Sequence, residues 1–570
     1  MSKSSRQFKC RVISKGVGEG EALVCSQPIG FNFGVDVPNG VIIEKGHELE
    51  GVSFTNKVLI FPHGKGSTGG SYVLYQVAKE GTGPAAMINL HTETILTAGA
   101  IMGRIPVVDR MQESPFDVIQ TGDYVQVDAV SGAVNVIPKN NPEHPTNGGK
   151  PEKFVTEATG DDRGGMALTD EQKEMLAGKR GEPLQVAMEM LCALGNIYGA
   201  DKLIPLKSAH IAGLSLKSHG IAGMEWAEDM ARKGAKVVVP TTCNVIGLDR
   251  SRDLGLPKDW CDHQMRIGQA YADMGCYFSS TCVPYYCGFL PKHKESIAWA
   301  ESSAVVFSNS VLGARDNREG GPSAWAAALV GATPNYGLHL DENRKGDILF
   351  KVNVPPKNIT DYGAIGNYVG KMVGEKIPVF EGLGNPTIED LVYFGSALAS
   401  SGSVALFHAI GITPEAPDLK TVFGDKKYEV VELGEAEIAQ GYKNLNCGKN
   451  KKIDYISIGC PHYSLNQIRE IALKLKGKKV HPDVAFWIHT NIPIKQLAIE
   501  CGYADMIEQS GAILTQDLCT ILSTPESIGF KVMATNSPKI AFYSPGNNKL
   551  EVWYGTEEQC IEAAVSGYWV

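Results

Sequence analysis

Four of the thirteen cysteines occupy one kind of position in the sequence. Each follows a short apolar run at or near the point where a predicted strand ends. If these strands are parallel, their carboxyl ends meet at one edge of a sheet, which is where ligands bind in open α/β folds. Thiolates that converge from separate loops are typical ligands of an iron–sulfur cluster or a soft metal ion. The four are Cys243, Cys282, Cys460 and Cys519.

The alternative is that these cysteines are small buried hydrophobic side chains, which is the usual role of cysteine in a large intracellular chain. An odd number of cysteines argues against a disulfide framework. The sequence contains no Cys-x-x-Cys pair, so neither a zinc ribbon nor a ferredoxin-type site is expected. Position alone therefore leaves a metal centre and buried structural thiols both open.

A second candidate for chemistry is the glycine-rich loop in residues 61–74, which joins a predicted strand to a predicted helix. A helix N-terminus offers free N–H groups, and glycine lets a ligand approach the backbone, so the loop could hold an anion. The residue order of a Walker A loop is absent. A serine here could act as a base if the helix and Lys65 stabilised its alkoxide. The alternative is that Ser67 or Ser71 caps the helix.

Two blocks of sequence must position these residues. Short apolar runs and turns in residues 1–138 predict a compact β-rich domain with one helix at 71–79. The Pro- and Gly-rich stretch 139–165 predicts a linker. In residues 166–570 helical patterns alternate with short strands, which is typical of mainly parallel sheets covered by helices. The strands predicted in this second block include 236–240, 277–280, 304–307, 453–458, 484–488 and 512–514.

Composition places the chain among ordinary globular proteins and argues against several classes of function. The net charge of −9 gives no reason to expect a nucleic acid or an anionic membrane as a partner. No apolar run is long enough to span a bilayer, and the N-terminus has no signal-peptide pattern. We therefore expect a cytoplasmic protein whose partner is a small molecule.

The chain resembles the aconitase X family over nearly its full length. Residues 1–138 are similar to the small swivel domain of that family, and residues 166–570 are similar to its large catalytic part. The resemblance implies a multi-domain aconitase-like α/β fold, with parallel and mixed sheets covered by helices and an N-terminal β-rich swivel domain. The motifs that carry it are GKGSTGGSY at 64–72, TCVPYY at 281–286, SNSVLGAR at 308–315, NREGG at 317–321 and IGCPH at 458–462.

This resemblance implies a hydro-lyase that removes water with the help of an iron–sulfur cluster. In mainstream aconitases a Gly-Ser loop of the swivel domain presents the serine that takes the proton, so Ser67 is the implied catalytic base. Cys282, Cys460 and Cys519 fall in the family's cysteine motifs and are the implied cluster ligands, with Cys243 in reserve. The mainstream pair of cysteines three residues apart is missing, so a two-iron cluster is favoured and three- and four-iron forms stay open.

Two subtypes of the family differ in chain organisation. One is a heterodimer of separate small and large subunits that dehydrates mevalonate 5-phosphate. The other is a fused chain that dehydrates cis-3-hydroxy-L-proline to 1-pyrroline-2-carboxylate. This chain is fused, and its TCNVIG at 242–247 departs from the Asn-Pro-Ala-Gly version of the phosphomevalonate enzymes. The resemblance thus favours a monomeric hydroxyproline dehydratase, in which cluster iron acts as a Lewis acid on the leaving hydroxyl. The candidate substrate-binding residues are Lys65, Gly213, Leu214, Ser215, Asn244, Ser308, Asn309 and Arg315.

Alternatives stay open for the function and for single residues. A mevalonate 5-phosphate dehydratase would need two or more basic side chains for the phosphate, and a full isomerase would add the water back. A cluster-bearing regulatory or RNA-binding protein and a zinc scaffold are further alternatives. Arg315 could be a structural ion-pair residue, and Asn309 could satisfy loop backbone groups. His63, His210 and His462 are candidate proton carriers, each with a structural hydrogen bond as its alternative.

Overall fold

The computed structural model of the chain describes residues 5–145, 165–374 and 376–570. The predicted linker 139–165 therefore lies largely outside the described residues. Two compact units are present: the first contains 1–204, 218–235 and 319–336, and the second contains 205–217, 236–318 and 337–570. Because the first unit gathers residues from both sides of the linker, the division into 1–138, 139–165 and 166–570 stays a prediction.

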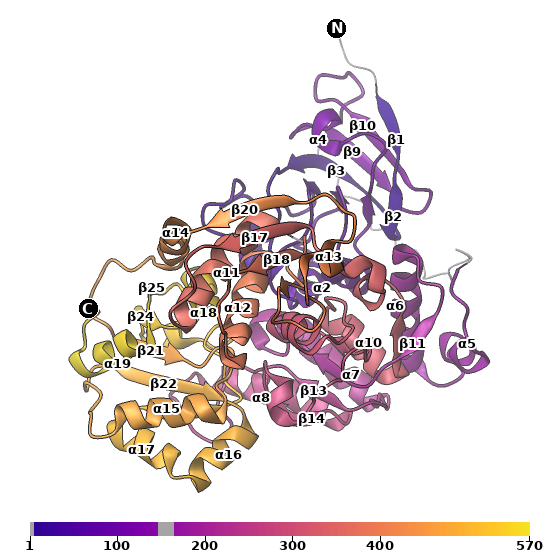
Figure 1. The fold of residues 1–570 in the computed structure, drawn as a ribbon. Helices are drawn as coiled ribbons and strands as arrows, with labels where there is room; N and C mark the ends of the chain where they lie inside the picture. The colour runs from indigo at the N-terminus through magenta and orange to yellow at the C-terminus, as the bar shows by residue number, and fades with distance from the viewer. Residues whose placement is uncertain (1–4, 146–164, 375) are drawn as a thin grey trace. The chain divides into compact units, whose positions relative to one another are not determined.

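One eight-stranded mixed sheet is the centre of the first unit (Figure 1). Its strands, in spatial order, are β1 (Arg6–Lys9), β10 (Ala133–Ile137), β9 (Tyr124–Asp128), β3 (Val17–Val24), β6 (Val58–Phe61), β7 (Ala86–Asn89), β8 (Val107–Asp109) and β2 (Arg11–Ser14). The run from β3 to β8 is parallel and the other pairs are antiparallel. Because only Cys10 separates β1 from β2, the sheet must curl until its two edges approach each other.

Two helices that pack closely together follow the central strands of this sheet. α2 (Gly70–Glu80) comes directly after the glycine-rich loop, and α3 (Thr94–Gly103) begins where the Glu93 carboxylate accepts two backbone N–H groups. A Cβ at Gly99 of α3 would lie 2.7 Å from the Ser71 Cα, so only glycine allows this packing. The other elements assigned to this unit are α1 (Phe31–Gly34), β4 (Val35–Asp36), η1 (Val37–Asn39), β5 (Val41–Ile42), α4 (Pro115–Val118), α5 (Asp170–Leu176), α6 (Glu182–Tyr198), most of β11 (Leu203–Pro205) and of α7 (Leu216–Arg232), α10 (Gly321–Val330) and β16 (Ala332–Pro334).

Three parallel sheets form the second unit, which confirms the predicted α/β architecture. Since all strands of a sheet run in one direction, their carboxyl ends line a single edge. The first sheet is β14 (Tyr277–Ser280), β13 (Thr241–Cys243), β12 (Ala209–Ile211) and β15 (Ala298–Trp299). The second is β19 (His408–Ala409), β18 (Pro378–Glu381), β17 (Ile348–Val352) and β20 (Glu429–Leu433). The third is β23 (Ile513–Gln516), β22 (Ala485–Thr490), β21 (Tyr455–Ile458), β24 (Val532–Thr535) and β25 (Glu551–Tyr554).

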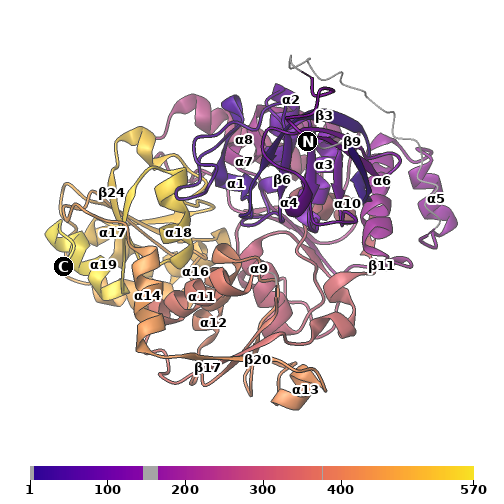
Figure 2. The same cartoon turned by 90° about the horizontal axis from the view of Figure 1, so that it is seen from above.

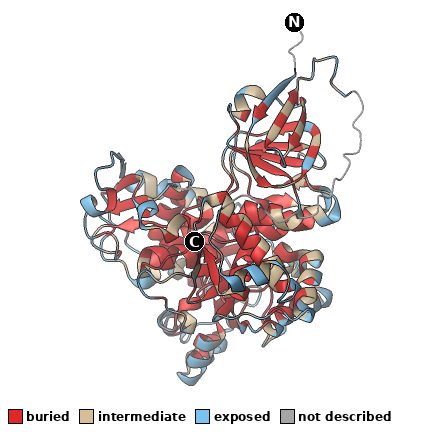
Figure 3. Cartoon of the chain, turned by 90° about the vertical axis from the view of Figure 1, so that its right-hand side faces the viewer, coloured by how far each residue is buried: buried red, intermediate tan, exposed pale blue. Residues whose placement is uncertain are grey.

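Helices cover these sheets. In Figure 2, α11 (Ile359–Val373), α12 (Ile388–Ser401) and α14 (Glu435–Leu445) lie beside β17 and β20, and they enclose an apolar core. Figure 3 shows that the buried residues follow the strands and the inner faces of the helices. In the described part of the chain no helix is both long and apolar enough to cross a bilayer. The remaining elements are α8 (Lys258–Asp273), η2 (Pro284–Cys287), α9 (Ser302–Phe307), η3 (Ser308–Leu312), η4 (Gly337–His339), η5 (Asp341–Arg344), α13 (Leu419–Phe423), α15 (Leu465–Leu475), α16 (Ile492–Glu500), α17 (Tyr503–Ser510), η6 (Pro525–Ile528), α18 (Pro538–Asn547) and α19 (Glu557–Ser566).

Two predicted strands of the second block are wrong. Residues 304–307 belong to α9, because Glu301 caps the run as a helix and a short apolar stretch has no periodicity that distinguishes helix from strand. Residues 236–240 are not a strand either; the chain enters the first sheet only with β13, and Val238 is exposed. Elsewhere in this block the predicted strand 277–280 coincides with β14.

Candidate active site

The carboxyl ends of two parallel sheets of the second unit meet, and the three expected cluster ligands lie there. Cys282 follows β14, Cys460 follows β21 and Cys519 follows β23. The backbone N–H of Cys519 donates to the carbonyl of Ile246, which follows β13, at 3.1 Å, and the Ile246 N–H donates to the carbonyl of Asp517 at 3.0 Å. The N–H of His462 donates to the Cys282 Sγ at 3.3 Å. Residues that are far apart in sequence are thereby joined at one place.

The three thiols are close neighbours in a buried setting, with residue exposures of 5–8%. Cys460 and Cys519 lie in hydrogen-bonding contact, and the charge of Cys282 acts on Cys460. The contact with Cys519, together with burial, raises the pKa of Cys460. The pKa of Cys519 is lowered because Cys460 and the backbone N–H of Leu522 donate to its sulfur. Burial raises the pKa of Cys282.

The donor set fits an iron–sulfur cluster. Among the described residues no three His, Cys, Asp or Glu side chains lie close enough to hold one metal ion. Sulfur ligands of one zinc ion lie about 2.3 Å from it and hence close to one another. The irons and bridging sulfides of a cluster hold the cysteine sulfurs further apart. Three buried thiols on separate loops have the chemistry that such a cluster requires.

Cys243, the reserve ligand, has a different partner. It ends β13, and its thiol lies in hydrogen-bonding contact with that of Cys276, which precedes β14. Both residues are buried. The contact with Cys276, with burial added, raises the pKa of Cys243. This arrangement favours a structural role for Cys243.

A buried ion pair beside the three cysteines is the main feature that sequence reasoning missed. Glu301 follows β15 and caps α9, and Lys539 lies in the first turn of α18, after β24. The Lys539 Nζ contacts a carboxylate oxygen of Glu301 and lies 3.2 Å from the Ser302 Oγ. The Asn244 Nδ2 donates to the other Glu301 oxygen at 2.6 Å. Both charged residues follow strand ends, which is the signal that located the cysteines.

Both members of this pair stay charged. Burial alone would raise the pKa of Glu301, but Lys539 and His210 hold it below its usual value. Burial alone would lower the pKa of Lys539, but Glu301 and Cys460 hold it above its usual value. The ammonium of Lys539 also favours the thiolate forms of the three cysteines. The site therefore holds one fixed cation and one fixed anion next to the expected cluster ligands.

The three candidate histidines differ in how their ring nitrogens are used. The His462 Nδ1 contacts the Thr281 hydroxyl at 3.1 Å and its Nε2 the carbonyl of Leu518 at 3.0 Å, which favours a structural role. In the first unit, the His63 Nδ1 contacts the carbonyl of the next residue. His210 lies in β12; its Nδ1 contacts the Thr242 Oγ1 at 2.8 Å. The His210 Nε2 is buried and has no hydrogen-bond partner among the described residues.

Several candidate substrate-binding residues of the second unit are engaged by the protein itself. After β12, the Ser215 Oγ donates to the carbonyl of Leu522 at 2.8 Å, and the carbonyl of Leu214 accepts from Gln264 at 2.7 Å. Gly213 adopts a positive φ of 86°, which glycine permits. The Ser308 hydroxyl, at the start of η3, donates to the carbonyl of Val305 in α9 at 2.9 Å. Of the candidates in this unit, Asn244 is the one that lies directly against the ion pair.

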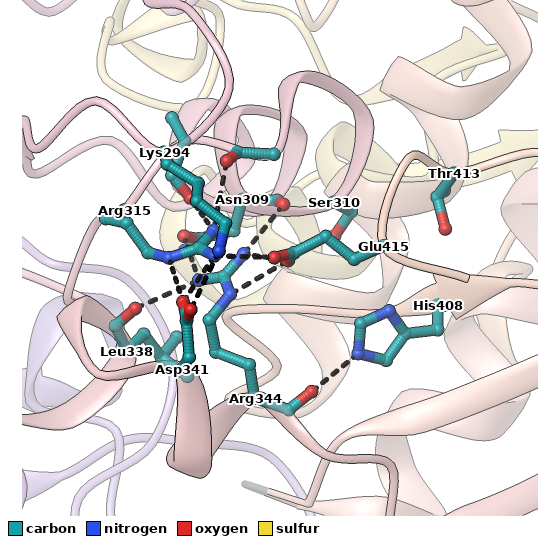
Figure 4. A network of polar contacts seen from close by, with 12 residues as sticks. Lys294, Asn309, Ser310, Arg315, Leu338, Asp341, Arg344, His408, Thr413 and Glu415 are labelled. Atoms are coloured by element: carbon teal, nitrogen blue, oxygen red, sulfur yellow. Dashed lines mark hydrogen bonds and ion pairs between the residues drawn. The ribbon is translucent and has the colours of Figure 1, made fainter. Parts of the chain in front are cut away.

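Asn309 and Arg315 belong to a buried polar network (Figure 4). The Asn309 amide donates to the carbonyls of Asp316 and Ala405. Arg315 pairs with Asp341 at 2.6 Å and with Glu415 at 2.7 Å. These contacts favour the structural alternative for both residues.

The glycine-rich loop of the first unit leaves Ser67 away from a capping role. Gly69 is the N-cap of α2, and no side chain caps this helix. The Ser71 hydroxyl donates to the carbonyl of Ile95 at 2.7 Å. Lys65 pairs with Glu44 at 2.6 Å, and both side chains are about 30% exposed. Neither Ser67 nor Ser71 therefore caps α2, and Ser67 stays the proposed base.

Comparisons with known proteins agree with this architecture. Residues 7–136 match the aconitase X swivel domain, and residues 165–342, 346–443 and 453–566 match the first, second and third domains of aconitase X. Three relatives illustrate the match. The phosphomevalonate dehydratase large subunit of Methanocaldococcus jannaschii is 44% identical over 406 residues, which are 70% of this chain and 100% of that subunit. The cis-3-hydroxy-L-proline dehydratase of Hypocrea jecorina is 32% identical over 579 residues, with 98% and 96% coverage. The crystal structure of Thermococcus kodakaraensis aconitase X (holo-form) is 42% identical, with a TM-score of 0.65, 70% coverage of this chain and 100% of that one.

A swivel domain joined to three α/β domains defines an aconitase-type hydro-lyase. More narrowly, the chain belongs to the aconitase X family, as a single chain in which the swivel domain and the large domains are fused.

Proposed function

We propose that this hydro-lyase dehydrates cis-3-hydroxy-L-proline to 1-pyrroline-2-carboxylate with an iron–sulfur cluster of the two-iron type. The observation that carries the choice of substrate is the charge pattern near the cysteines, where basic side chains already have carboxylate partners. Lys539 pairs with Glu301, Arg250 with Asp517 and Lys217 with Glu526. A phosphate ester would need two or more basic side chains of its own. A zwitterionic amino acid has no such requirement.

In this proposal the chain's own residues bind and orient the substrate and move a proton. Cys282, Cys460 and Cys519 hold the cluster, whose iron supplies a Lewis acid for the leaving hydroxyl. Ser67 takes the proton from Cα, and the positive dipole end of α2 stabilises its alkoxide. The carbanion-like charge that develops spreads into the substrate carboxylate. The hydroxyl then leaves and becomes water with the proton that Ser67 removed from Cα, and the resulting enamine tautomerises to the cyclic imine as its N–H proton moves to C3.

A second candidate is mevalonate 5-phosphate, and sequence identity is the observation that favours it. The chain is 44% identical to a phosphomevalonate dehydratase large subunit and 32% identical to a full-length cis-3-hydroxy-L-proline dehydratase. The longer alignment includes the swivel domain in one chain, whereas the large subunit covers 70% of this chain. The sequence identity therefore favours mevalonate 5-phosphate, whereas the fused chain favours cis-3-hydroxy-L-proline.

The deciding experiment is a direct assay of both compounds with protein prepared without oxygen. We expect turnover of cis-3-hydroxy-L-proline, with 1-pyrroline-2-carboxylate as the product by NMR and mass spectrometry and no return of water. Iron and sulfide determination and electron paramagnetic resonance on the same sample measure the type of cluster. Turnover of mevalonate 5-phosphate alone would overturn the assignment, and a hydrated isomer as the product would show an isomerase.

A further inference from the structure

We propose that the Glu301–Lys539 ion pair is the receptor for a zwitterionic substrate, in which Lys539 binds the carboxylate and Glu301 binds the ring ammonium. This inference rests on the proposed function, since it concerns how the same site recognises an amino acid. It assigns a role to two residues outside the motifs that carry the family resemblance. Asn244 acts as a positioning residue for Glu301.

The position of the pair is the first argument. Asn244 and Glu301 follow two strands of the first sheet, and Lys539 follows a strand of the third sheet. Cys282 and Cys460 follow neighbouring strands of these same two sheets. Because the carboxyl ends of parallel strands share one edge, the ion pair and the expected cluster ligands belong to one site.

The second argument is the energetic cost of the pair. Glu301 and Lys539 are 3% and 8% exposed. Burying two charges costs several kcal/mol per ion, so an isolated buried pair contributes little net stability. The protein nevertheless surrounds this pair with donors: Asn244 at 2.6 Å and the Ser303 Oγ at 3.0 Å from the Glu301 carboxylate, and Ser302 beside Lys539. Donors that surround a contact of little net stability are expected where the two charges bind a ligand.

The third argument is chemical complementarity. An α-amino acid carries its anion and its cation on neighbouring atoms of one carbon. When it binds between Glu301 and Lys539, each protein charge exchanges its partner for an opposite charge of the ligand, and the net buried charge stays zero. A ligand with the same ring and carboxylate but no ammonium leaves Glu301 facing an anion. That repulsion is the discriminating element.

The fourth argument is an unpartnered polar atom at the same edge. His210 lies in β12, between the strands that precede Asn244 and Glu301 in the sheet. The residue is fully buried, and its Nε2 has no hydrogen-bond partner among the described residues. A buried polar atom without a partner needs one to offset its desolvation. A polar ligand next to Glu301 would provide it.

The test compares two ligands that differ in one ring atom, with anaerobically prepared holoenzyme and isothermal titration calorimetry. L-Proline has the ring ammonium, and (S)-tetrahydrofuran-2-carboxylate has an ether oxygen in its place. We expect the wild type to bind L-proline at least tenfold more tightly. In Glu301→Gln this ratio should fall below about threefold. Glu508→Gln, which alters an exposed ion pair with Arg252, is the matched control and should keep the ratio.

A charge-balanced variant covers the case in which Glu301→Gln does not fold with Lys539 left unpaired. The double variant Glu301→Gln/Lys539→Met removes both charges, which proteins usually tolerate better than the loss of one. It should bind both ligands weakly and equally. A preserved preference for L-proline in either variant would overturn this inference, even if the enzyme dehydrates cis-3-hydroxy-L-proline. A wild type that binds neither ligand and dehydrates mevalonate 5-phosphate would instead overturn the proposed function.

Discussion

Replacing Glu415 with Gln should destabilise the second unit and leave substrate affinity unchanged. The Glu415 carboxylate binds the Arg315 guanidinium at 2.7 Å and the Arg344 guanidinium at 2.6 Å (Figure 4). These two side chains are only 4% and 3% exposed, so they have little access to water that could replace the lost charge. The amide would leave two buried cations side by side, with Asp341 as the remaining anion of the network.

The magnitude follows from the burial of the partners. Removing one member of a buried ion pair costs about 3–5 kcal/mol, because an uncompensated buried charge remains. Glu415 itself is 16% exposed and Arg315 keeps Asp341, so we expect the lower end, about 3 kcal/mol. That is roughly two orders of magnitude in the folding equilibrium constant.

The assay is urea unfolding at pH 7 for the wild type, Glu415→Gln and a control. Asp483→Asn is the control, because its pair with Lys452 is 3.5 Å long and more than half exposed on both sides. An exposed pair of this kind contributes about 0–1 kcal/mol. Unchanged stability together with a KM raised tenfold or more would refute the reasoning, since it would show that this network binds substrate through Arg315.

The shifted pKa of Glu415 also determines in which direction folding stability changes with pH. Burial would raise the pKa of Glu415, but Arg344 and Arg315 hold it below its usual value. The folded pKa is thus lower than the unfolded pKa, which is about 4.3. The contribution of Glu415 is fully present above that value and is lost as the pH falls through the folded pKa. Glu415→Gln should lack this part of the acid destabilisation.

Three further results are expected. Ser67→Ala should abolish turnover and keep the cluster's visible absorption, whereas Cys460→Ala should lose both; near-normal turnover by Ser67→Ala would refute the assigned base. Gly459→Ala should lower iron content and thermal stability, because Gly459 has a φ of +86° and a Cβ there would lie 2.4 Å from the His489 carbonyl oxygen. Unchanged iron content would show that the Cys460 loop tolerates the backbone shift that the added Cβ requires. Burial raises the pKa of Glu319 to about 7, so folding takes up a proton and the free energy of unfolding falls as the pH rises from the carboxyl's usual range to about 7. Glu319→Gln should flatten this slope and should raise the free energy of unfolding at pH 8, measured with urea, by roughly 3 kcal/mol. An unchanged slope would contradict this prediction.

The cysteines could be located from the sequence because short apolar runs identify strands, and ligands bind at the carboxyl ends of parallel strands. Cys282 and Cys460 could be found in this way without any contact information. Glu301 and Lys539 lie at the same edges, but a charged residue after a strand is usually solvated. Their burial and pairing depend on two sheets that come together, which no local pattern encodes.

Side-chain roles were harder to predict than element positions for the same reason. Arg315 lies in a motif and is chemically suited to bind a carboxylate, yet Glu415, a hundred residues further on, is its partner. Residues 304–307 have the composition of a buried strand, but they belong to a helix whose N-cap, Glu301, accepts a hydrogen bond from the Ser303 N–H. Long-range pairing decided the role of Arg315, whereas a local capping contact decided the helix.

The first unit is discontinuous along the chain, and this has a consequence for synthesis. α10, which is buried along nearly its whole length, packs against α6 but is translated more than a hundred residues later. While a ribosome is still producing the intervening residues, the part of α6 that packs against α10 is uncovered. The nascent protein should therefore depend most on chaperones between the emergence of α6 and that of α10.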